Sequence, residues 1–265
     1  MSNRSTRHPS LALRVALALC GTGLALAAVH AAETTGQTVT VAMRYVEPPF
    51  KGGSKVRTPE DIDGVLASQL AARLNRTLRA EPLASAKAAH PRIALVGLPG
   101  NLESTGDDVI VFTGYVSRPM AIMRTDTDIT SWSQLKGRSV CVSEGGAYVG
   151  RIAAEYGAIE KVFPAPADSL LALRTGGCDA AVHDDVMLKE LLKLPEWKKF
   201  SANLTSDEAS RLAFVLPADA AEPVAAAREL AKAWKTNAYL STLNTQRVRD
   251  IAFEVYLDQT VPDCH

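Results

Sequence analysis

Two neighbouring carboxylates follow an apolar, strand-like segment in the second half of the chain. Residues 179–183 have the pattern of a buried strand, and Asp184 and Asp185 come directly after it. A carboxylate at the carboxyl end of such a strand lies where α/β sheets bind their ligands, and it can hold a cationic group there. The alternative is a cap for the following helix, a role that aspartate fills well. The pattern favours ligand binding for Asp184 more than for Asp185, and we expect His183 to fill space beside them.

A glycine-rich turn joins another predicted strand to a helix. Its free backbone N–H groups, at the positive end of the helix dipole, suit an anion. The alternative is a plain strand-to-helix turn that needs glycine for its backbone angles. Both interpretations stay open because Glu144, next to the turn, would oppose an anion. The residues of this turn are Gly145, Gly146 and Ala147.

Alternating strands and helices must position these groups. Strand patterns occur at 39–43, 92–98, 109–112, 120–123, 139–143, 162–163, 179–183 and 212–216. Helical patterns occur at 64–75, 130–135, 148–156, 168–174 and 186–192, and in two pieces over 223–258 with a break near 237–240. This alternation predicts the α/β class.

Composition and charge exclude several classes of protein. The chain has 265 residues, of which 47% are hydrophobic and 22% charged, so it is neither wholly disordered nor collagen-like. Lys+Arg and Asp+Glu both number 29, a balance that argues against nucleic-acid binding. The sequence has no His/Cys cluster with metal-ligand spacing, no phosphate loop and no nucleophile motif, so we expect no metal and no cofactor.

The first 31 residues have the three-part pattern of a secretory signal peptide. Three arginines precede an apolar run from Val15 to Val29, and small residues follow at the positions that a signal peptidase reads. A transmembrane anchor is the alternative, but the run is shorter than the roughly 20 residues that a span needs. Cleavage after Ala31 would remove three basic residues and no acidic ones, leaving 26 against 29 and a net charge of −3. The remaining chain would be exported to a compartment where disulfides persist.

Six short segments stand in a characteristic order after this leader. They are Pro48-Pro49-Phe50, Gly64 at the start of a helix, Phe112-Thr113-Gly114-Tyr115, Leu135 to Val142 with Gly145-Gly146, Gly177 to Asp184, and Arg211 to Pro217. Together they resemble the family 3 solute-binding proteins of bacterial ABC importers. The resemblance implies the two-lobe periplasmic binding protein type II fold, an α/β fold with the ligand cleft between the lobes.

The resemblance also implies a domain organisation and a function. Lobe 1 would comprise residues 32–124 and 217–265, with the final helices packed on it, and lobe 2 would comprise residues 125–216. A periplasmic monomer without enzymatic activity would capture a small-molecule ligand by hinge closure and deliver it to an ABC permease in the inner membrane. Two alternatives remain open: an accessory or sensory protein, and a dehydratase-like enzyme on the same fold. In the enzyme, Glu47, His183 or Asp184 would be the general acid or base.

The same resemblance assigns roles to the candidate ligand-binding residues. Asp184 would hold the ligand's ammonium group, and the glycine turn would meet its carboxylate. Phe50 would pack against the ligand or else belong to the core. Glu47 would face the cleft and favour a cationic or hydroxyl-rich ligand, or else be a solvated surface charge. Tyr115 and Arg118 would lie at the hinge near the cleft.

One residue that the resemblance leads us to expect is missing. Family members that bind amino acids usually carry an arginine for the α-carboxylate after the third strand, whereas residues 97–105 contain none. Whether Arg92 or Arg118 replaces it stays open, and so does the identity of the ligand.

The resemblance further implies a disulfide between Cys141 and Cys178, which begin two strands of the predicted lobe 2. The closed loop would contain 38 residues. A loop of that size corresponds to roughly 4 kcal/mol in the chain-entropy account of disulfide stabilisation. Cys264 is left without an assigned partner.

Overall fold

The computed structural model describes residues 37–49, 51–53, 55–85, 93–99 and 107–260. All of these residues belong to one compact unit of the chain. The predicted signal peptide, residues 1–31, therefore stays a prediction. Phe50, Arg92 and Cys264 also lie outside the described residues.

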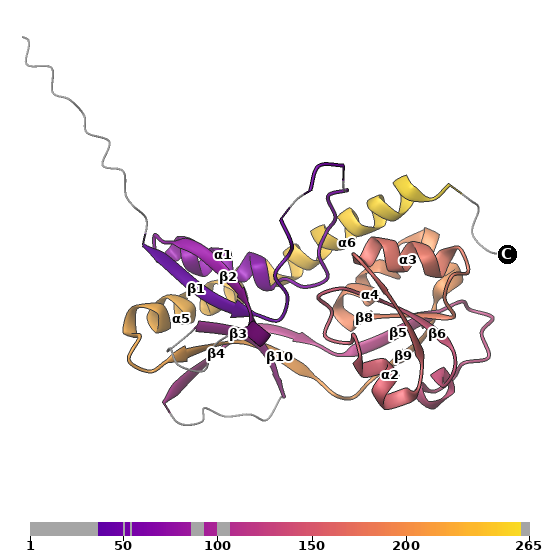
Figure 1. The fold of residues 1–265 in the computed structure, drawn as a ribbon, viewed down its shortest axis with the longest axis horizontal. Helices are drawn as coiled ribbons and strands as arrows, with labels where there is room; N and C mark the ends of the chain where they lie inside the picture. The colour runs from indigo at the N-terminus through magenta and orange to yellow at the C-terminus, as the bar shows by residue number, and fades with distance from the viewer. Residues whose placement is uncertain (1–36, 50, 54, 86–92, 100–106, 261–265) are drawn as a thin grey trace, which may run out of the picture. The chain divides into compact units, whose positions relative to one another are not determined.

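Two mixed five-stranded sheets form the framework (Figure 1). The first sheet has the order β2-β1-β3-β10-β4, in which β1 runs parallel to β2 and β3, while β10 is antiparallel to β3 and β4. Its strands are β1 (Thr38–Met43), β2 (Thr77–Pro82), β3 (Ile93–Pro99), β4 (Asp108–Ser117) and β10 (Ser210–Pro217). The second sheet has the order β7-β6-β8-β5-β9, with β6 parallel to β7 and β8 and β5 antiparallel to β8 and β9. Its strands are β5 (Pro119–Met123), β6 (Ser139–Ser143), β7 (Ile159–Phe163), β8 (Ala180–Asp184) and β9 (Ala202–Thr205).

Helices pack on both sheets and bury the apolar stripes seen in the sequence. Leu66 and Leu70, four residues apart, are both fully buried, as helical spacing predicts. The helices are α1 (Asp63–Arg73), α2 (Arg151–Tyr156), α3 (Pro166–Arg174), α4 (Asp185–Leu191), α5 (Ala221–Thr236) and α6 (Tyr239–Asp258). Short 3₁₀ helices are η1 (Leu83–Ser85), η2 (Trp132–Leu135) and η3 (Pro195–Phe200). The predicted α/β class is confirmed, and none of the described helices is long and apolar enough to cross a membrane.

Helix α6, the longest described helix, connects two of the three hydrophobic clusters of the described residues, one beside the first sheet (the first core) and one beside the second sheet (the second core). Tyr239, Leu240 and Leu243 pack against the first core, whereas Val248 and Val255 belong to the second. We expected the final helices on the first lobe alone, but α6 has 20 residues and so is about 30 Å long, enough to reach both cores. The predicted lobe boundaries stay a prediction, yet the C-terminal half of α6 packs with the second sheet.

The chain crosses between the sheets twice, and the crossings lie side by side. Only Arg118 separates β4 from β5. Strand β5 pairs within the second sheet, although its residues fall inside the segment 32–124 that was expected for lobe 1. Ser117 in β4 stands in register with Ser210 in β10, and the Ser206 N–H donates to the Pro119 carbonyl at 2.9 Å. Two paired crossings of this kind suit a hinge.

Two strands, β2 and β9, do not appear among the strands predicted from the sequence. Both are edge strands whose residues are half-buried or exposed. Edge strands need no continuous apolar face, and the sequence pattern therefore does not reveal them.

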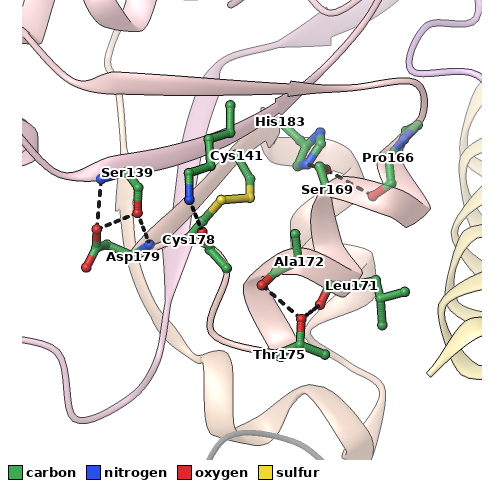
Figure 2. Close-up of a disulfide and its surroundings, with 12 residues drawn as sticks. Ser139, Cys141, Pro166, Ser169, Leu171, Ala172, Thr175, Cys178, Asp179 and His183 are labelled. Atoms are coloured by element: carbon green, nitrogen blue, oxygen red, sulfur yellow. Dashed lines mark hydrogen bonds between the residues drawn. A yellow bond between two sulfur atoms is a disulfide. The ribbon is translucent and has the colours of Figure 1, made fainter. Parts of the chain in front are cut away.

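The Cys141–Cys178 disulfide that the resemblance implied is present (Figure 2). Its Cα atoms lie 5.8 Å apart, and the two cysteines join β6 to the start of its parallel neighbour β8. Beside it, Asp179 accepts hydrogen bonds from the Ser139 N–H at 2.8 Å and from the Ser139 hydroxyl at 2.7 Å. The disulfide therefore fixes β6 to the strand that carries Asp184.

Replacing both Cys141 and Cys178 by serine should lower the free energy of unfolding by up to about 4 kcal/mol, because the unfolded chain regains the entropy of the closed loop. Urea unfolding of the exported chain measures this loss. Cys264→Ser is the matched control and should unfold like the unmodified chain. Equal stability of the double variant and the control would contradict a structural role for the bond.

Candidate functional site

A small cavity of about 30 Å³ lies where the chain crosses between the sheets. A water molecule needs about 10–15 Å³, so the cavity accommodates roughly two groups of that size. Three predicted ligand-binding residues line it, namely Tyr115, Ala147 and Asp184. Arg44, Asp61 and Asp63, which the sequence did not single out, also line it. The cavity thus combines side chains from both sheets.

Asp184, at the end of β8, is held by two tyrosines. The Tyr115 hydroxyl donates to its Oδ2 at 2.8 Å, and the Tyr148 hydroxyl donates to its Oδ1 at 2.6 Å. Burial raises the pKa of Asp184, and the nearby Glu60 carboxylate adds to this, whereas the two tyrosine bonds oppose it. Burial and the Asp184 charge also raise the pKa of both phenols. Because Tyr115 comes from β4 and Asp184 from β8, this contact joins the two sheets.

Asp185 anchors the crossing instead of lining the cavity. It is buried, and its Oδ1 accepts a hydrogen bond from the Arg118 N–H at 2.9 Å, while its own N–H donates to the Arg118 carbonyl at 2.9 Å. Lys189 pairs with its other oxygen at 2.7 Å. The predicted hinge position of Arg118 agrees with this geometry. Its side chain is not among the described groups that line the cavity.

Asp61 and Asp63 stand just before and at the start of α1. Asp63 is only 2% exposed, and the Oδ2 atom of each aspartate is buried without a hydrogen-bond partner among the described residues. Burial raises the pKa of Asp61 to about 6 and raises that of Asp63 well above its usual value. The repeat Asp61-Ile62-Asp63 ahead of an apolar helix was the available sequence signal, but aspartates there usually serve as helix caps.

Arg44 follows β1 and lies at the mouth of the cavity. It lines both the cavity and an adjoining groove of about 560 Å³, and Gly97 and Ser210 are likewise shared. A Cβ atom on Gly97 would stand 2.4 Å from the Ser210 hydroxyl and 3.4 Å from the Arg44 guanidinium, so glycine makes room for both. A guanidinium at this mouth was not predicted, because Arg44 lies in the first loop rather than after the third strand.

Glu60 connects the loop before α1 to the second sheet. Its Oε2 lies 2.8 Å from His183 Nδ1, and the Ser143 hydroxyl donates to the same oxygen. The Arg247 guanidinium of α6 donates to the Glu60 carbonyl at 2.6 Å. Burial would raise the pKa of the Glu60 carboxyl, but His183, Ser143 and Arg247 outweigh it and the pKa is lowered.

Ser169, His183 and Glu60 follow one another in the order of a hydrolytic triad, with Ser169 Oγ 2.8 Å from His183 Nε2. All three are buried, and in the described part of the chain none lines the cavity or its groove. A nucleophile must reach its substrate, so this row of side chains is structural.

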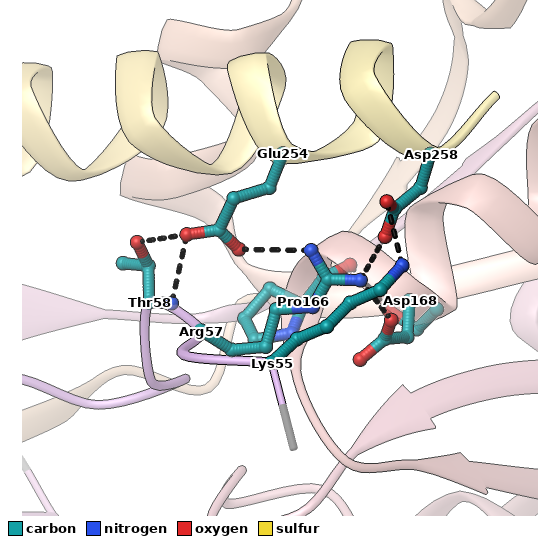
Figure 3. Close-up of polar contacts among 8 residues, drawn as sticks. Lys55, Arg57, Thr58, Pro166, Asp168, Glu254 and Asp258 are labelled. Carbon is teal, nitrogen blue, oxygen red and sulfur yellow. Dashed lines mark hydrogen bonds and ion pairs between the residues drawn. The ribbon is translucent and has the colours of Figure 1, made fainter. Parts of the chain in front are cut away.

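A second set of polar contacts holds the segment before Glu60 against the helices of the second sheet (Figure 3). Arg57 lies 2.8 Å from Asp168 of α3 and also pairs with Asp258 of α6. The Thr58 N–H and hydroxyl both donate to Glu254 Oε1, at 2.9 and 2.7 Å. Residues 57–60 therefore bind both α3 and α6, close to the cavity.

The predicted glycine turn packs tightly against the first loop. Gly145 has a φ of +79°, and a Cβ atom there would lie 2.8 Å from Tyr45 Cδ1. The Gly146 N–H donates to the Ser143 carbonyl at 3.1 Å. Close packing and backbone angle account for these glycines, and their anion-binding role stays a prediction. Helix α2 begins only at Arg151, later than expected.

Glu47 does not line the cavity. It is exposed and borders a separate groove of about 510 Å³ together with Tyr45 and Glu144. Its charge and that of Glu144 help burial to raise the pKa of Tyr45. Glu47 therefore fits the surface-charge alternative in this arrangement, and the predicted role of Phe50 falls outside the described residues.

Comparison with known proteins bears on the fold alone. No protein-family model and no curated protein sequence matches the chain. The amino acid ABC transporter substrate-binding protein AbpA from Streptococcus pneumoniae, solved with L-arginine, aligns with a TM-score of 0.51 at 16% identity, covering 81% of this chain and 95% of that one. An arginine periplasmic binding protein from Legionella pneumophila aligns with a TM-score of 0.47 at 15% identity, covering 80% of this chain and 100% of that one. The chain therefore has the two-lobe fold that the sequence resemblance implied.

Gly145→Ala should destabilise the protein more than Gly150→Ala. Both glycines have a positive φ, +79° and +78°, so each alanine incurs about 1–2 kcal/mol of backbone strain. Only position 145 adds a collision with Tyr45, since nothing lies within 4 Å of a Cβ at Gly150. We expect a further loss of about 1–3 kcal/mol in urea unfolding. Adding Tyr45→Ala should recover that further loss, and equal losses in the two single variants would refute the packing account.

Asp61→Asn should stabilise the protein at neutral pH. The folded pKa of about 6 lies above the unfolded value of 3.8, so the native state binds this proton more tightly and loses stability as pH rises between these values. The free energy of unfolding of Asp61→Asn should exceed that of the unmodified chain by about 1–3 kcal/mol above pH 6, and this gain should vanish below about pH 4. Urea unfolding across this range measures it, with the exposed Asp207→Asn as control. A destabilised Asp61→Asn at pH 7.5 would show that this carboxylate has a stabilising partner.

Proposed function

We propose that this protein is a periplasmic solute-binding protein that closes its two lobes on a small polar solute and delivers it to an ABC permease. The observation that carries the proposal is the cavity lined from both sheets, across which Tyr115 donates a hydrogen bond to Asp184. A ligand that touches both lobes shifts the balance from open to closed forms. The fold likeness supports binding rather than catalysis, and we propose that the solute is released unchanged.

The two adjacent crossings supply the hinge for this closure. Asp185 holds both the N–H and the carbonyl of Arg118, which anchors the first crossing to the second sheet. A change of angle between lobes then falls on a few backbone dihedrals near 117–119 and 206–209. The contacts of residues 57–60 with α3 and α6 would form on closing and hold the closed form.

The cavity and its groove bound the size of the solute. The cavity alone holds only one small polar head group, whereas the groove of about 560 Å³ beyond Arg44 has room for the rest of a small molecule. The predicted signal peptide and the disulfide support an oxidising compartment outside the cytoplasm. We propose a monomer, as the resemblance implies, with a permease as its partner.

Asp184→Asn should weaken solute binding at least tenfold. The substitution keeps the shape of the side chain but removes the charge that Tyr115 and Tyr148 both contact, so the closed form loses a link between the lobes. A thermal-shift screen of the exported chain over amino acids, polyamines, organic acids and small cations identifies the solute. Calorimetric titration then compares this variant with Asp219→Asn, a control at an exposed residue that lies outside the cavity, its groove and the two crossings.

Closure itself has an independent readout. Small-angle X-ray scattering should show a smaller radius of gyration on adding the solute to the unmodified chain. Unchanged affinity in Asp184→Asn would remove Asp184 from the site. A screen in which no compound binds would refute the proposed function.

A further inference from the structure

Negative charge exceeds positive charge around the cavity. Two of the nearby carboxylates are satisfied within the protein: Glu60 by His183 and Ser143, and Asp184 by the two tyrosines. The described side chains neutralise the charge of the remaining two carboxylates, Asp61 and Asp63, only in part. The charged groups that face them are Arg44 after β1, Glu60 in the same loop, Asp184 on β8 and Arg247 on α6.

Each of these two aspartates has an oxygen that lacks a partner. Asp63 is 98% buried and lines the cavity, yet neither its Oδ2 nor that of Asp61 accepts a hydrogen bond from any described residue. Native structures leave very few buried polar atoms in this condition, and a missing ion or ligand group is a common reason. The raised pKa values of both carboxyls have the same cause, since burial outweighs the attraction of Arg44.

The two arginines do not fill this role. The Arg247 guanidinium donates to the carbonyls of Pro59 and Glu60, at 2.9 and 2.6 Å. Arg44 is an exposed residue at the mouth, where it borders the groove as well as the cavity. We therefore infer that a cation from outside the chain binds beside Asp61 and Asp63.

The size and lining of the cavity select the kind of cation. About 30 Å³ fits a primary ammonium, which has nearly the volume of water, but not a trimethylammonium group. An ammonium has three N–H donors, and Ser117 and Ser210, two hydroxyl-bearing residues, line the same cavity as the two aspartates. Among the described residues, no group of three or more His, Cys, Asp or Glu side chains is arranged to hold a metal ion.

On the premise of the proposed solute-binding function, we propose that Asp61 and Asp63 form a subsite for the primary ammonium group of a small organic amine. The body of the amine occupies the groove beyond Arg44. The subsite belongs to the first sheet's side of the cavity. It differs from the assignment that the resemblance implied, in which Asp184 on the second sheet holds the ammonium, because both oxygens of Asp184 already accept tyrosine hydroxyls.

The test compares probes with one body and three head groups. Butylamine, butyltrimethylammonium and 1-butanol are titrated into the ¹⁵N-labelled exported chain at pH 7.5, and affinity is read from amide chemical shifts. We expect butylamine to bind at least tenfold more tightly than either of the others. Potassium chloride at equal ionic strength should not compete with it.

The variants separate the two possible carboxylate sites. Asp61→Asn/Asp63→Asn should weaken butylamine binding at least tenfold and leave 1-butanol unaffected, and it should fold, since it removes two carboxyl groups that each have a buried oxygen without a partner. Asp184→Asn should retain the preference for butylamine over 1-butanol. The proposal would be overturned if Asp184→Asn lost the preference for butylamine and the double variant kept it. Equal binding of all three probes, or competition by potassium, would also overturn it.

The experiments distinguish a failure of the ammonium subsite from a failure of the proposed solute-binding function. If the solute found by thermal-shift screening carries no amine and still closes the lobes in scattering, the ammonium subsite is wrong and the solute-binding function stands. If butylamine binds at Asp61 and Asp63 but no solute changes the radius of gyration, the subsite stands and the closure mechanism is wrong.

Discussion

The hydrogen bonds of the Glu60 carboxylate to His183 and Ser143 fix the loop before α1 against the second sheet. Successive residues of a strand face opposite sides of its sheet. His183 therefore faces the buried helix α3 through Ser169, while Asp184, the next residue, faces the cleft. Because Glu60 is held on one side of β8, its neighbours Asp61 and Asp63 are placed near Asp184. The geometry of the cavity depends on this one buried contact.

The loop before α1 contains one carboxylate with side-chain partners, Glu60, and two carboxylates with an oxygen that has none, Asp61 and Asp63. The Glu60 carboxylate contacts His183 and Ser143, and its pKa is lowered, so it favours folding above its ordinary titration range. Asp61 and Asp63 have raised pKa values because burial removes water, while the Oδ2 atom of each has no hydrogen-bond partner among the described residues. Buried charges that reduce stability persist where binding requires them, and residues of this kind commonly form sites. We therefore infer different roles for these neighbouring side chains of like chemistry.

Periodicity predicted most helices and inner strands, because a buried face leaves a regular apolar spacing, as Leu66 and Leu70 show. It did not predict what each face packs against. The apolar stripe of α6 is continuous whether the helix covers one core or two, so its contact with the second core was missed. Asp184, which lines the cavity, was singled out in the sequence because a carboxylate after a strand has a characteristic position. Arg44 was not, because its role depends on Gly97 and Ser210, which are distant in sequence.

The division of roles around the cavity also suggests an order of events in binding. Asp61 and Asp63 belong to the first sheet's side and each have an oxygen without a described partner, whereas Asp184 of the second sheet is paired with Tyr115 of the first. A cationic solute would thus bind the first lobe while the cleft is open, and its charge would replace the proton that the raised pKa of Asp63 favours. Closure would then bring Tyr115, Asp184 and Tyr148 together behind the bound group. On this reasoning the second lobe senses occupancy through a hydrogen bond between protein side chains, and its aspartate need not touch the solute's charge.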